Sequence, residues 1–459
     1  MDRYDLVVLG GGPGGYVAAI KAAQLGARVA LVEKNRLGGV CLNWGCIPTK
    51  TMLVTARHYR DILRAEEFGI KGLDTAKVGI DLKLLLERKD RVVNRLVSGI
   101  EMLIKKNKID FYYGMGKVSN DGQLEVNGET LAYDKLIIAT GASSRYPDIP
   151  GLAELIKSGR AMDSYGALQL EEVPAEIIVL GANVYAIEFA TLFNALGSKV
   201  TIIHKAKQIL PFIENELAKT LERQLKKEGI KIVSQAELKE VKDGMLLVDH
   251  KGKDKTFTAD KYFLFLGTKA NLTGLEGLNL KLNPRGFIET NDRMETSLDG
   301  VYAIGDVIGK YPLAHVASAE GIVAAENIMG IPSRLNYRLA PSVVYSFPEL
   351  ASVGITEEMA KEEGLDYKVS KFPLMANGMA IANDETVGFV KIISDNQYGE
   401  VVGVHIMSHH ASDMISQAVA LMQIEGTVHD LAKAIHPHPT FAEAMVEAAY
   451  GAIDRPIHI

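Results

Sequence analysis

A glycine-rich segment close to the N-terminus constrains the fold of this chain more than any other feature. It reads Gly10-Gly-Gly12-Pro-Gly-Gly15, follows an apolar run at 4–9 and precedes a helical pattern at 16–25. The next apolar run, 28–33, ends in Glu33. Glycines permit a tight turn and close backbone approach to a pyrophosphate, the helix N-terminus favours the anion, and the carboxylate accepts hydrogen bonds from ribose hydroxyls. The segment therefore predicts a parallel βαβ unit that binds a dinucleotide.

A second βαβ unit is predicted in the middle of the chain, with a strand at 177–180, a helix at 186–196 and a strand at 199–204. Two further strands, 133–141 and 263–267, run into glycines and close these units. Beyond Val301–Asp306 we expect a helix at 314–328 and a turn-rich segment at 330–341, after which a new domain begins. Its expected elements are strands near 342–347, 386–393 and 401–406, and helices at 411–425 and 427–434.

Composition narrows the possible functions. The 459 residues are enough for two to four domains, and 47% hydrophobic residues provide a large core. The net charge of −6, without a basic cluster, argues against nucleic-acid binding and a polybasic membrane anchor. The chain opens directly into a strand-like run, so no signal peptide is expected, and the apolar stretch 177–193 is interrupted by Asn183 and Glu188. We expect a cytoplasmic protein with no membrane contact.

The only two cysteines of the chain, Cys41 and Cys46, lie five positions apart. Chance is a poor explanation for this spacing, and a structural disulfide is unexpected in a reducing cytosol. The pair could serve redox catalysis or form half of a metal site. Because no further cysteines and histidines nearby would complete a zinc shell, we favour redox catalysis and expect no metal. The chain's one tryptophan, Trp44, lies between the cysteines and is expected to be a packing residue.

The segment around the cysteines reads Gly38-Gly39-Val-Cys41-Leu-Asn-Trp-Gly-Cys46-Ile-Pro-Thr-Lys50. It resembles the redox-active segment of the pyridine nucleotide-disulfide oxidoreductases, and the order of motifs matches that family across essentially the whole chain. Within the family the match is nearest to the dihydrolipoamide dehydrogenases. The resemblance implies a tightly bound FAD, a Cys41–Cys46 redox disulfide, and a cation at Lys50 near the flavin ring with Glu188 as its partner.

The resemblance also implies the residues that surround FAD. Asp306, at a strand end, would accept from a ribityl hydroxyl. The expected FAD contacts are Gly10, Gly12, Pro13, Gly14, Gly15, Glu33, Gly39, Lys50, Gly116, Thr140, Gly141, Asp306, Leu313, Ala314 and His315.

A second catalytic segment lies near the C-terminus, where His436-Pro-His438-Pro-Thr-Phe-Ala-Glu443 opens a helix. A histidine five residues before a glutamate suits an imidazole that a carboxylate orients. In the resembled family this segment supplies the catalytic base to the partner subunit's disulfide. The resemblance therefore implies that His438 is the base, that Glu443 holds its ring, and that the chain is a homodimer with shared active sites.

The nicotinamide site departs from the family pattern. The second glycine motif reads Gly181-Ala-Asn183-Val-Tyr185-Ala186, so Asn183 adds a side chain at the phosphate cleft and weaker nucleotide binding is expected. His204 replaces the strand-end acid, with Lys205 and Lys207 close by, and Gly267 begins an altered turn. NAD remains the expected nucleotide, and NADP is conceivable because cationic side chains accept a 2′-phosphate.

The predicted fold is an α/β protein with two Rossmann-like dinucleotide-binding domains and a C-terminal α+β dimerisation domain. We expect an FAD-binding domain at 1–145, an NAD(P)-binding domain at 146–271, the resumed FAD-binding domain at 272–338 and the dimer-interface domain at 339–459. The expected activity is the oxidation of dihydrolipoamide, on a lipoyl-bearing protein or as a small dithiol, with NAD. Two alternatives stay open: an NADPH-dependent small-disulfide reductase, and an FAD electron-transfer or scaffold subunit with a non-nicotinamide partner.

Overall fold

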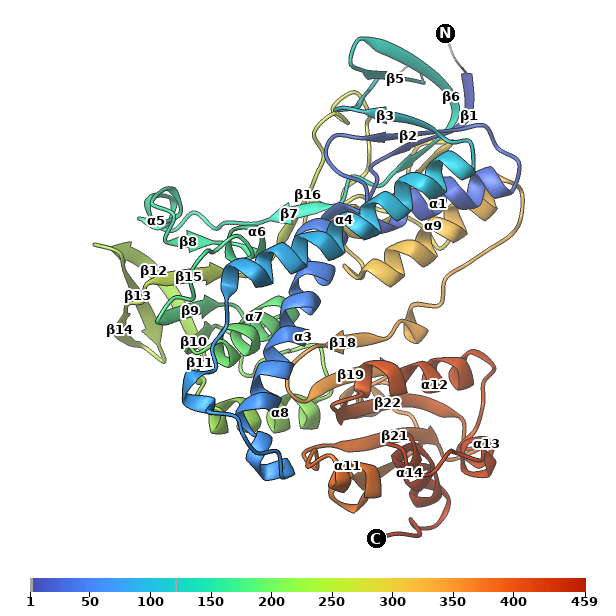
Figure 1. Cartoon of the computed structure of the whole chain (residues 1–459). Coiled ribbons are helices and arrows are strands. Elements are labelled where there is room, and N and C mark those ends of the chain that lie inside the picture. The colour runs from blue at the N-terminus through green and yellow to red at the C-terminus, as the bar shows by residue number, and fades with distance from the viewer. Residues whose placement is uncertain (1–2, 120–121) are drawn as a thin grey trace.

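The first sheet is built from segments far apart in the sequence (Figure 1). We describe a computed structural model that covers residues 3–119 and 122–459. The seven-stranded sheet has the order β3-β2-β1-β6-β5-β4, and β17 pairs with β6. Strand β17 lies parallel to β6 with Ala303 opposite Ile138, so the chain returns to its first sheet after building a second one. The strands are β1 (Arg3–Leu9), β2 (Val29–Glu33), β3 (Asp110–Tyr113), β4 (Lys117–Val118), β5 (Gln123–Val126), β6 (Glu129–Ile138) and β17 (Val301–Ala303).

Three helices, α1 (Pro13–Gln24), α4 (Leu82–Lys106) and α9 (Ala314–Ile328), lie side by side along this sheet (Figure 1). Helices α1 and α9 pack closely because glycines face the contact. A Cβ atom on Gly321 would lie 2.5 Å from the Gly14 carbonyl oxygen, a distance that excludes any larger residue.

The second sheet has the order β11-β10-β9-β15-β8, and its strands are parallel. Helix α7 (Val184–Ala195) follows β9 as α1 follows β1. A small antiparallel sheet and a two-stranded ribbon that pairs β7 with β16 accompany it. The elements are β7 (Ala142–Ser144), α5 (Leu152–Lys157), β8 (Ala161–Met162), α6 (Ser164–Ala167), β9 (Glu176–Leu180), β10 (Lys199–His204), α8 (Asn215–Lys227), β11 (Lys231–Ser234), β12 (Ala236–Lys242), β13 (Met245–His250), β14 (Lys253–Phe257), β15 (Lys261–Leu264) and β16 (Thr268–Ala270).

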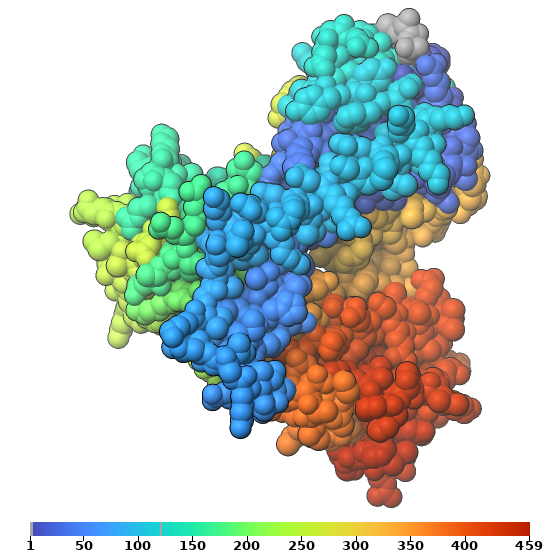
Figure 2. Space-filling model, in the orientation of Figure 1, coloured from blue at the N-terminus to red at the C-terminus, as the bar shows by residue number. Residues whose placement is uncertain are grey.

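The C-terminal sheet is antiparallel, with the order β18-β19-β22-β21-β20. It forms the red and orange mass of Figure 2, set apart from the lobe built by the first sheet. Its elements are β18 (Ser342–Val344), β19 (Glu349–Gly354), α10 (Glu357–Glu362), β20 (Tyr367–Pro373), α11 (Gly378–Ala382), β21 (Phe389–Asp395), β22 (Val401–Ser408), α12 (Ala411–Gln423), α13 (Val428–Lys433) and α14 (Glu443–Ile453).

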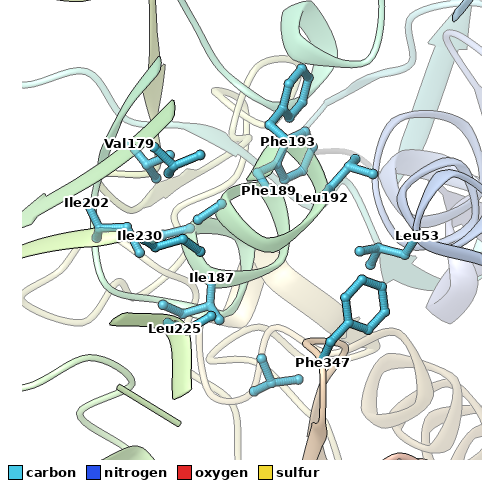
Figure 3. Packing of buried hydrophobic residues seen from close by; sticks show 14 of the residues in the cluster. Leu53, Val179, Ile187, Phe189, Leu192, Phe193, Ile202, Leu225, Ile230 and Phe347 are labelled. Carbon is cyan, nitrogen blue, oxygen red and sulfur yellow. The ribbon is translucent and has the colours of Figure 1, made fainter. Parts of the chain in front are cut away.

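Helix α3 (Cys46–Leu63) connects the three parts and begins at the second cysteine. The shorter helix α2 (Gly39–Trp44) precedes it and carries the first cysteine. Figure 3 shows Leu53 of α3 and Phe347 of the C-terminal segment approaching Leu192 and Phe189 of α7. Because these apolar side chains share one buried cluster, the N-terminus of α3 is held in a fixed place relative to both α7 and the C-terminal sheet.

The predicted elements agree with the structure, with shifted ends. The helix at 314–328 is found as predicted, whereas α1 and α7 begin earlier, at Pro13 and Val184. Strands β19 and β20 escaped prediction. The residues of β19, Glu-Leu-Ala-Ser-Val-Gly, lack the alternation of a half-exposed strand because four of the six, including the first three, are buried, and pairing with β22 decides their conformation. Throughout 3–119 and 122–459, no helix combines the length and the apolar character needed to cross a bilayer.

Candidate redox site

The two cysteines lie on either side of a break between helices α2 and α3. Cys41 is in the middle of α2, and Cys46 is the first residue of α3. Gly45 separates the helices with φ −135° and ψ −109°, and a Cβ atom on it would lie 3.1 Å from the Val40 carbonyl oxygen. This break turns the chain so that both thiol groups share one half-buried place.

The two thiols differ in their affinity for a proton. The hydrogen bond between the sulfur groups raises the pKa of Cys41, and burial raises it further. The same hydrogen bond lowers the pKa of Cys46, against the effect of burial, and the Lys50 ammonium lowers it too. The position of Cys46 at a helix N-terminus acts in the same direction, because the helix dipole favours an anion there. In the reduced pair the negative charge therefore belongs on Cys46.

Lys50 and Glu188 form a bidentate ion pair between α3 and α7. Lys50 Nζ lies 2.8 Å and 2.7 Å from the two carboxylate oxygens of Glu188, and Glu188 is only 1% exposed. Burial alone would lower the pKa of Lys50, but the Glu188 carboxylate outweighs it, so the pKa is raised. Lys50 stays charged beside Cys46.

Tyr345 completes this group from the C-terminal segment. Its backbone N–H donates to Glu188 at 3.2 Å, and its ring lies 4.5 Å from Lys50 Nζ. Sequence reasoning missed this residue, because an aromatic residue just after strand β18 carries no local sign of a partner located 295 positions earlier in the chain. Trp44 packs edge-on against Tyr165, with ring centroids 6.0 Å apart.

The first glycine motif forms an open cradle. Gly10 directly follows β1 and has φ +112°, and a Cβ atom there would lie 2.2 Å from the Ala139 carbonyl oxygen. A Cβ atom on Gly15 would lie 1.8 Å from the carbonyl oxygen of Gly10. At the N-cap of α1, by contrast, a Cβ atom on Gly12 would meet only the Cα atom of Gly39, at 3.8 Å, and no side chain caps the helix. The start of α1 therefore has no side-chain cap, and space remains beside Gly12.

Two further predicted FAD contacts, Glu33 and Asp306, lie at or just after the ends of strands of the first sheet. Glu33 ends β2 and accepts hydrogen bonds from Gly11 N–H at 2.6 Å and Asn35 N–H at 2.7 Å. Asp306 is in the 3₁₀ turn Gly305–Ile308 after β17, and its carboxylate has no hydrogen-bond partner in the described chain, 3–119 and 122–459. Burial raises the pKa of Asp306 to about 6.

Several predicted contacts have packing roles that the sequence did not reveal. Thr140 Oγ1 donates to the Asn271 carbonyl at 2.7 Å, and the next residue, Gly141, has φ +71°. His315 Nε2 is hydrogen-bonded to the Pro341 carbonyl at 2.8 Å. A Cβ atom on Gly116 would lie 2.6 Å from a methyl group of Leu9, so Gly116 packs closely against β1. Pro13 and Gly14 are in the first turn of α1, and Leu313 and Ala314 begin α9.

The second glycine motif is closed by its own side chain. Asn183 is the N-cap of α7, and its Oδ1 accepts a hydrogen bond of 3.1 Å from Ala186 N–H. Its Nδ2 donates to the Phe265 carbonyl at 3.1 Å. The Asn183 side chain thus occupies a helix amide that would otherwise be available to a phosphate. It also connects the start of α7 to the Phe265 carbonyl across the turn. Gly181 has φ +137°, in the positive region that favours glycine.

The other predicted nucleotide contacts are close to this turn. Tyr185 stacks on Phe265, with centroids 6.1 Å apart, and burial raises its pKa, with the cysteines and Asp306 adding to the effect. His204 ends β10, is 5% exposed, and forms a 3.1 Å hydrogen bond with Ser234. Burial lowers the pKa of His204. Gly267 has φ +107° and accepts from Arg145 N–H at 2.9 Å.

His438 and Glu443 lie together far from the cysteines in sequence, on the C-terminal part of the chain. His438 Nδ1 donates to Glu443 Oε1 at 2.8 Å, and Thr440 N–H donates to the other oxygen at 2.7 Å. Burial would raise the pKa of Glu443, but these two hydrogen bonds lower it. The His438 side chain is 79% exposed, so Nε2 is free to meet a group outside this chain.

Comparisons with known proteins agree with this geometry. The family model "Pyridine nucleotide-disulphide oxidoreductase" matches residues 4–321, and the dimerisation domain of the same family matches residues 340–449. Dihydrolipoyl dehydrogenase of Bacillus subtilis is 42% identical over 99% of both chains. Dihydrolipoyl dehydrogenase of Geobacillus stearothermophilus is 41% identical over 99% of this chain and 97% of the relative.

Solved structures give the same picture. RclA of Escherichia coli, a flavoprotein disulfide reductase induced by HOCl and solved as a Cu(II) complex, has a TM-score of 0.86 at 27% identity over 98% of this chain and 99% of its own. LpdA of Mycobacterium tuberculosis has a TM-score of 0.88 at 24% identity, over 98% and 99% of the two chains, which supports the fold.

Proposed function

Because this chain belongs to the pyridine nucleotide-disulphide oxidoreductase family, we propose that it oxidises dihydrolipoamide to lipoamide with NAD, through FAD and the Cys41–Cys46 pair. The chain is an oxidoreductase, and its relatives over nearly the full length are dihydrolipoyl dehydrogenases. It carries the family's dimerisation domain and forms a homodimer. The observation that carries the proposal is the asymmetric cysteine pair beside the buried Lys50–Glu188 ion pair.

The first glycine motif fits FAD. The open N-terminus of α1 suits a pyrophosphate, since a side chain at Gly12 would fill the space between Gly12 and Gly39. The unpartnered Asp306 carboxylate suits a ribityl hydroxyl. FAD, when bound, accepts the electron pair from the dithiol and passes it on as hydride to a nicotinamide.

The chemistry of the chain begins with a proton. A thiol of the substrate gives its proton to His438 Nε2, while Glu443 holds the opposite ring nitrogen. The resulting thiolate attacks Cys41 Sγ, the Cys41–Cys46 bond breaks, and Cys46 leaves as a thiolate that Lys50 stabilises. As the second substrate thiol attacks the substrate sulfur of the mixed disulfide, His438 gives its first proton to the departing Cys41 and takes the proton of the attacking thiol. The products are an oxidised substrate and a reduced cysteine pair.

His438 needs a partner subunit to meet a cysteine pair. The dyad is exposed, and Ile435 beside it is 99% exposed. A large apolar side chain in that position is stabilised when a second copy covers it. We therefore propose that His438 and Glu443 of one subunit act on Cys41 of the other.

We propose the predicted domain limits, 1–145, 146–271, 272–338 and 339–459, on the basis of sheet membership. A cytoplasmic location is proposed as well, because a redox pair that cycles as dithiol requires a compartment that does not oxidise it permanently.

An anaerobic titration tests the function. Dihydrolipoamide should produce a long-wavelength charge-transfer band between a Cys46 thiolate and the flavin, and NAD should discharge it. Cys46→Ser should abolish the band, and its persistence contradicts the assignment. His438→Gln should slow reduction by dihydrolipoamide by a factor on the order of 100. His436→Gln is the matched control, because His436 is hydrogen-bonded to Gln417 within its own chain and should keep the rate.

A second function is favoured by one observation, the closure of the second glycine motif by Asn183. In this alternative the flavin passes its electrons to a redox protein instead of a nicotinamide. The same titration separates the two: if the dithiol reduces the flavin and neither NAD nor NADP reoxidises it, the electron partner is different.

A further inference from the structure

A buried carboxyl group that takes no part in the proposed chemistry lies directly behind the Asp306 turn. Glu320, on α9, is 1% exposed. Its Oε2 accepts a 2.6 Å hydrogen bond from Gly305 N–H, and its Oε1 accepts a 2.7 Å hydrogen bond from the Tyr337 hydroxyl. No cation forms an ion pair with Glu320 in the described parts of the chain. A buried ionised carboxylate with neutral partners alone is costly, so this residue requires an explanation.

The surroundings allow Glu320 to exist in either protonation state. When it is ionised, Tyr337 donates to it. When it is protonated, its own O–H can donate to the Tyr337 oxygen, and the Tyr337 hydrogen can then point to Met294 Sδ, 3.9 Å away. Tyr337 therefore satisfies the carboxyl group before and after it binds a proton, and a buried group without such a partner would leave one donor unpaired.

The charged groups around Glu320 come from each neighbouring element. The turn Gly305–Ile308 provides Asp306, whose charge raises the pKa of Glu320, and the following residues provide Lys310, whose charge lowers it. Tyr337 comes from the 3₁₀ turn Tyr337–Leu339 and stacks on Tyr311. Helix α1 meets the neighbouring Gly321 through Gly14 and Ala18, which carry no charge. Burial raises the pKa of Glu320 to about 7.

We propose that Glu320 is a positioning residue that takes up a proton when the flavin beside Asp306 is reduced. The inference rests on the proposed function, because it needs FAD at Asp306. Two electrons pass from the dithiol to the flavin, and one proton passes from solvent to the Glu320 carboxylate. The added negative charge next to the Asp306 turn favours the neutral carboxylic acid. Glu320 accepts the hydrogen bond from Gly305 N–H in both protonation states. The Asp306 turn therefore keeps its position while the charge of Glu320 changes.

The flavin midpoint potential of the holoenzyme, measured from about pH 6 to pH 9, tests this. One additional proton per two electrons makes the equilibrium constant change an additional tenfold per pH unit, which is about 30 mV for a two-electron couple. The wild-type protein should show this steeper slope above about pH 7. Glu320→Gln should lose it. Glu326→Gln, on the same helix and paired with Lys21 at the surface, should keep it.

A second readout follows the proton directly. The redox-induced infrared difference spectrum should contain a protonated carboxyl band, sensitive to deuteration, in the wild-type protein and in Glu326→Gln, and it should be absent in Glu320→Gln. If Glu320→Gln does not hold flavin, Tyr337→Phe replaces it and should move the change of slope to a different pH. A potential curve that none of these variants alters overturns the inference, whereas a wild-type protein that binds no flavin overturns the proposed function itself.

Discussion

At the N-terminus of α1 the N-cap residue is Gly12, with φ −70° and ψ −177°, and at the N-terminus of α7 it is Asn183, with φ −84° and ψ −179°. The backbones are nearly the same, and both follow a glycine whose φ is positive, Gly10 and Gly181. The helix amides are open in the first case and capped by a side-chain oxygen in the second. The backbone path is therefore the same in both motifs, and the Asn183 side chain makes the difference. It caps the helix amide that remains available to an anion in the first motif.

The third glycine position of the two motifs, Gly15 in the first and Ala186 in the second, also differs in its packing. A methyl group at Gly15 would lie 1.8 Å from the Gly10 carbonyl oxygen, whereas the second motif has Ala186 there, fully buried. The second turn therefore has room for a methyl group that the first one lacks. Asparagine at this position is compatible with the same fold, because its side chain forms hydrogen bonds of the kind that a phosphate would supply at the turn.

The largest expected effect is on FAD binding, when the first glycine motif is given the asparagine of the second. Gly12→Asn keeps an allowed backbone and meets only Gly39, so the chain should fold. Its side chain should cap α1 and displace the pyrophosphate. Loss of two charge-assisted hydrogen bonds, each contributing about 2 kcal/mol, weakens FAD binding on the order of 1000-fold. Bound flavin per chain measures this. Gly99→Asn, on α4 with nothing near its Cβ position, is the control, and equal flavin loss in both would contradict the argument.

A smaller effect is expected on the pH dependence of the free energy of unfolding. Its sign should be opposite for Glu320, in the first βαβ-based unit, and for His204, in the second. Burial raises the pKa of Glu320, in the first unit, from its ordinary 4.5 to about 7. The folded state then binds this proton more tightly than the unfolded state, so the free energy of unfolding falls as pH rises from about 4.5 to about 7. Burial lowers the pKa of His204, in the second unit, so its contribution is lost as pH falls below about 6.5.

Removing each group should therefore change the pH dependence in opposite directions. Glu320→Gln should raise the free energy of unfolding at about pH 8 relative to about pH 5 by at most about 3 kcal/mol, since one pKa unit is about 1.4 kcal/mol. His204→Asn should raise it at about pH 5 relative to about pH 8. Denaturant unfolding of the holoenzyme at the two pH values measures both. Parallel curves for the two variants would mean that these groups do not titrate as described.

The smallest expected effect is on the KM for NADH, when Asn183 of the second glycine motif is replaced by the glycine of the first. Asn183→Gly should lower the KM for NADH roughly fivefold, because freeing one helix amide for a phosphate contributes about 1 kcal/mol. The rate of reduction by dihydrolipoamide should stay the same. Asp81→Gly, which removes the cap of α4 far from the turn, controls for the loss of a cap. An unchanged KM would show that Asn183 and the nucleotide do not compete.

The sequence predicted the glycine turns, the cysteine pair and the departure at Asn183, because each depends on residues close together in the chain. It did not predict Tyr345 on Lys50, the hydrogen bond from Asn183 to the Phe265 carbonyl or the Glu320–Tyr337 contact. These interactions join segments that meet only after three sheets have formed. The roles assigned to the individual FAD contacts, to His438 and to Glu443 stay predictions for the experiments above.

By itself the sequence determined the chemistry available to this protein: a dinucleotide turn that only glycine can form at Gly10 and Gly15, two thiols five residues apart, and a histidine within reach of a carboxylate. The family resemblance named Glu188 as the partner of Lys50, but only the tertiary structure decided the burial and the neighbours of this pair. Helix α3 is held between α7 and the C-terminal sheet by a shared apolar core, and that packing brings Lys50 to a fully buried Glu188 and so to Cys46. The physical reason is that the interaction energy of a charge and the pKa of its neighbours depend on burial and on partners distant in sequence. Neither exists until the core has formed.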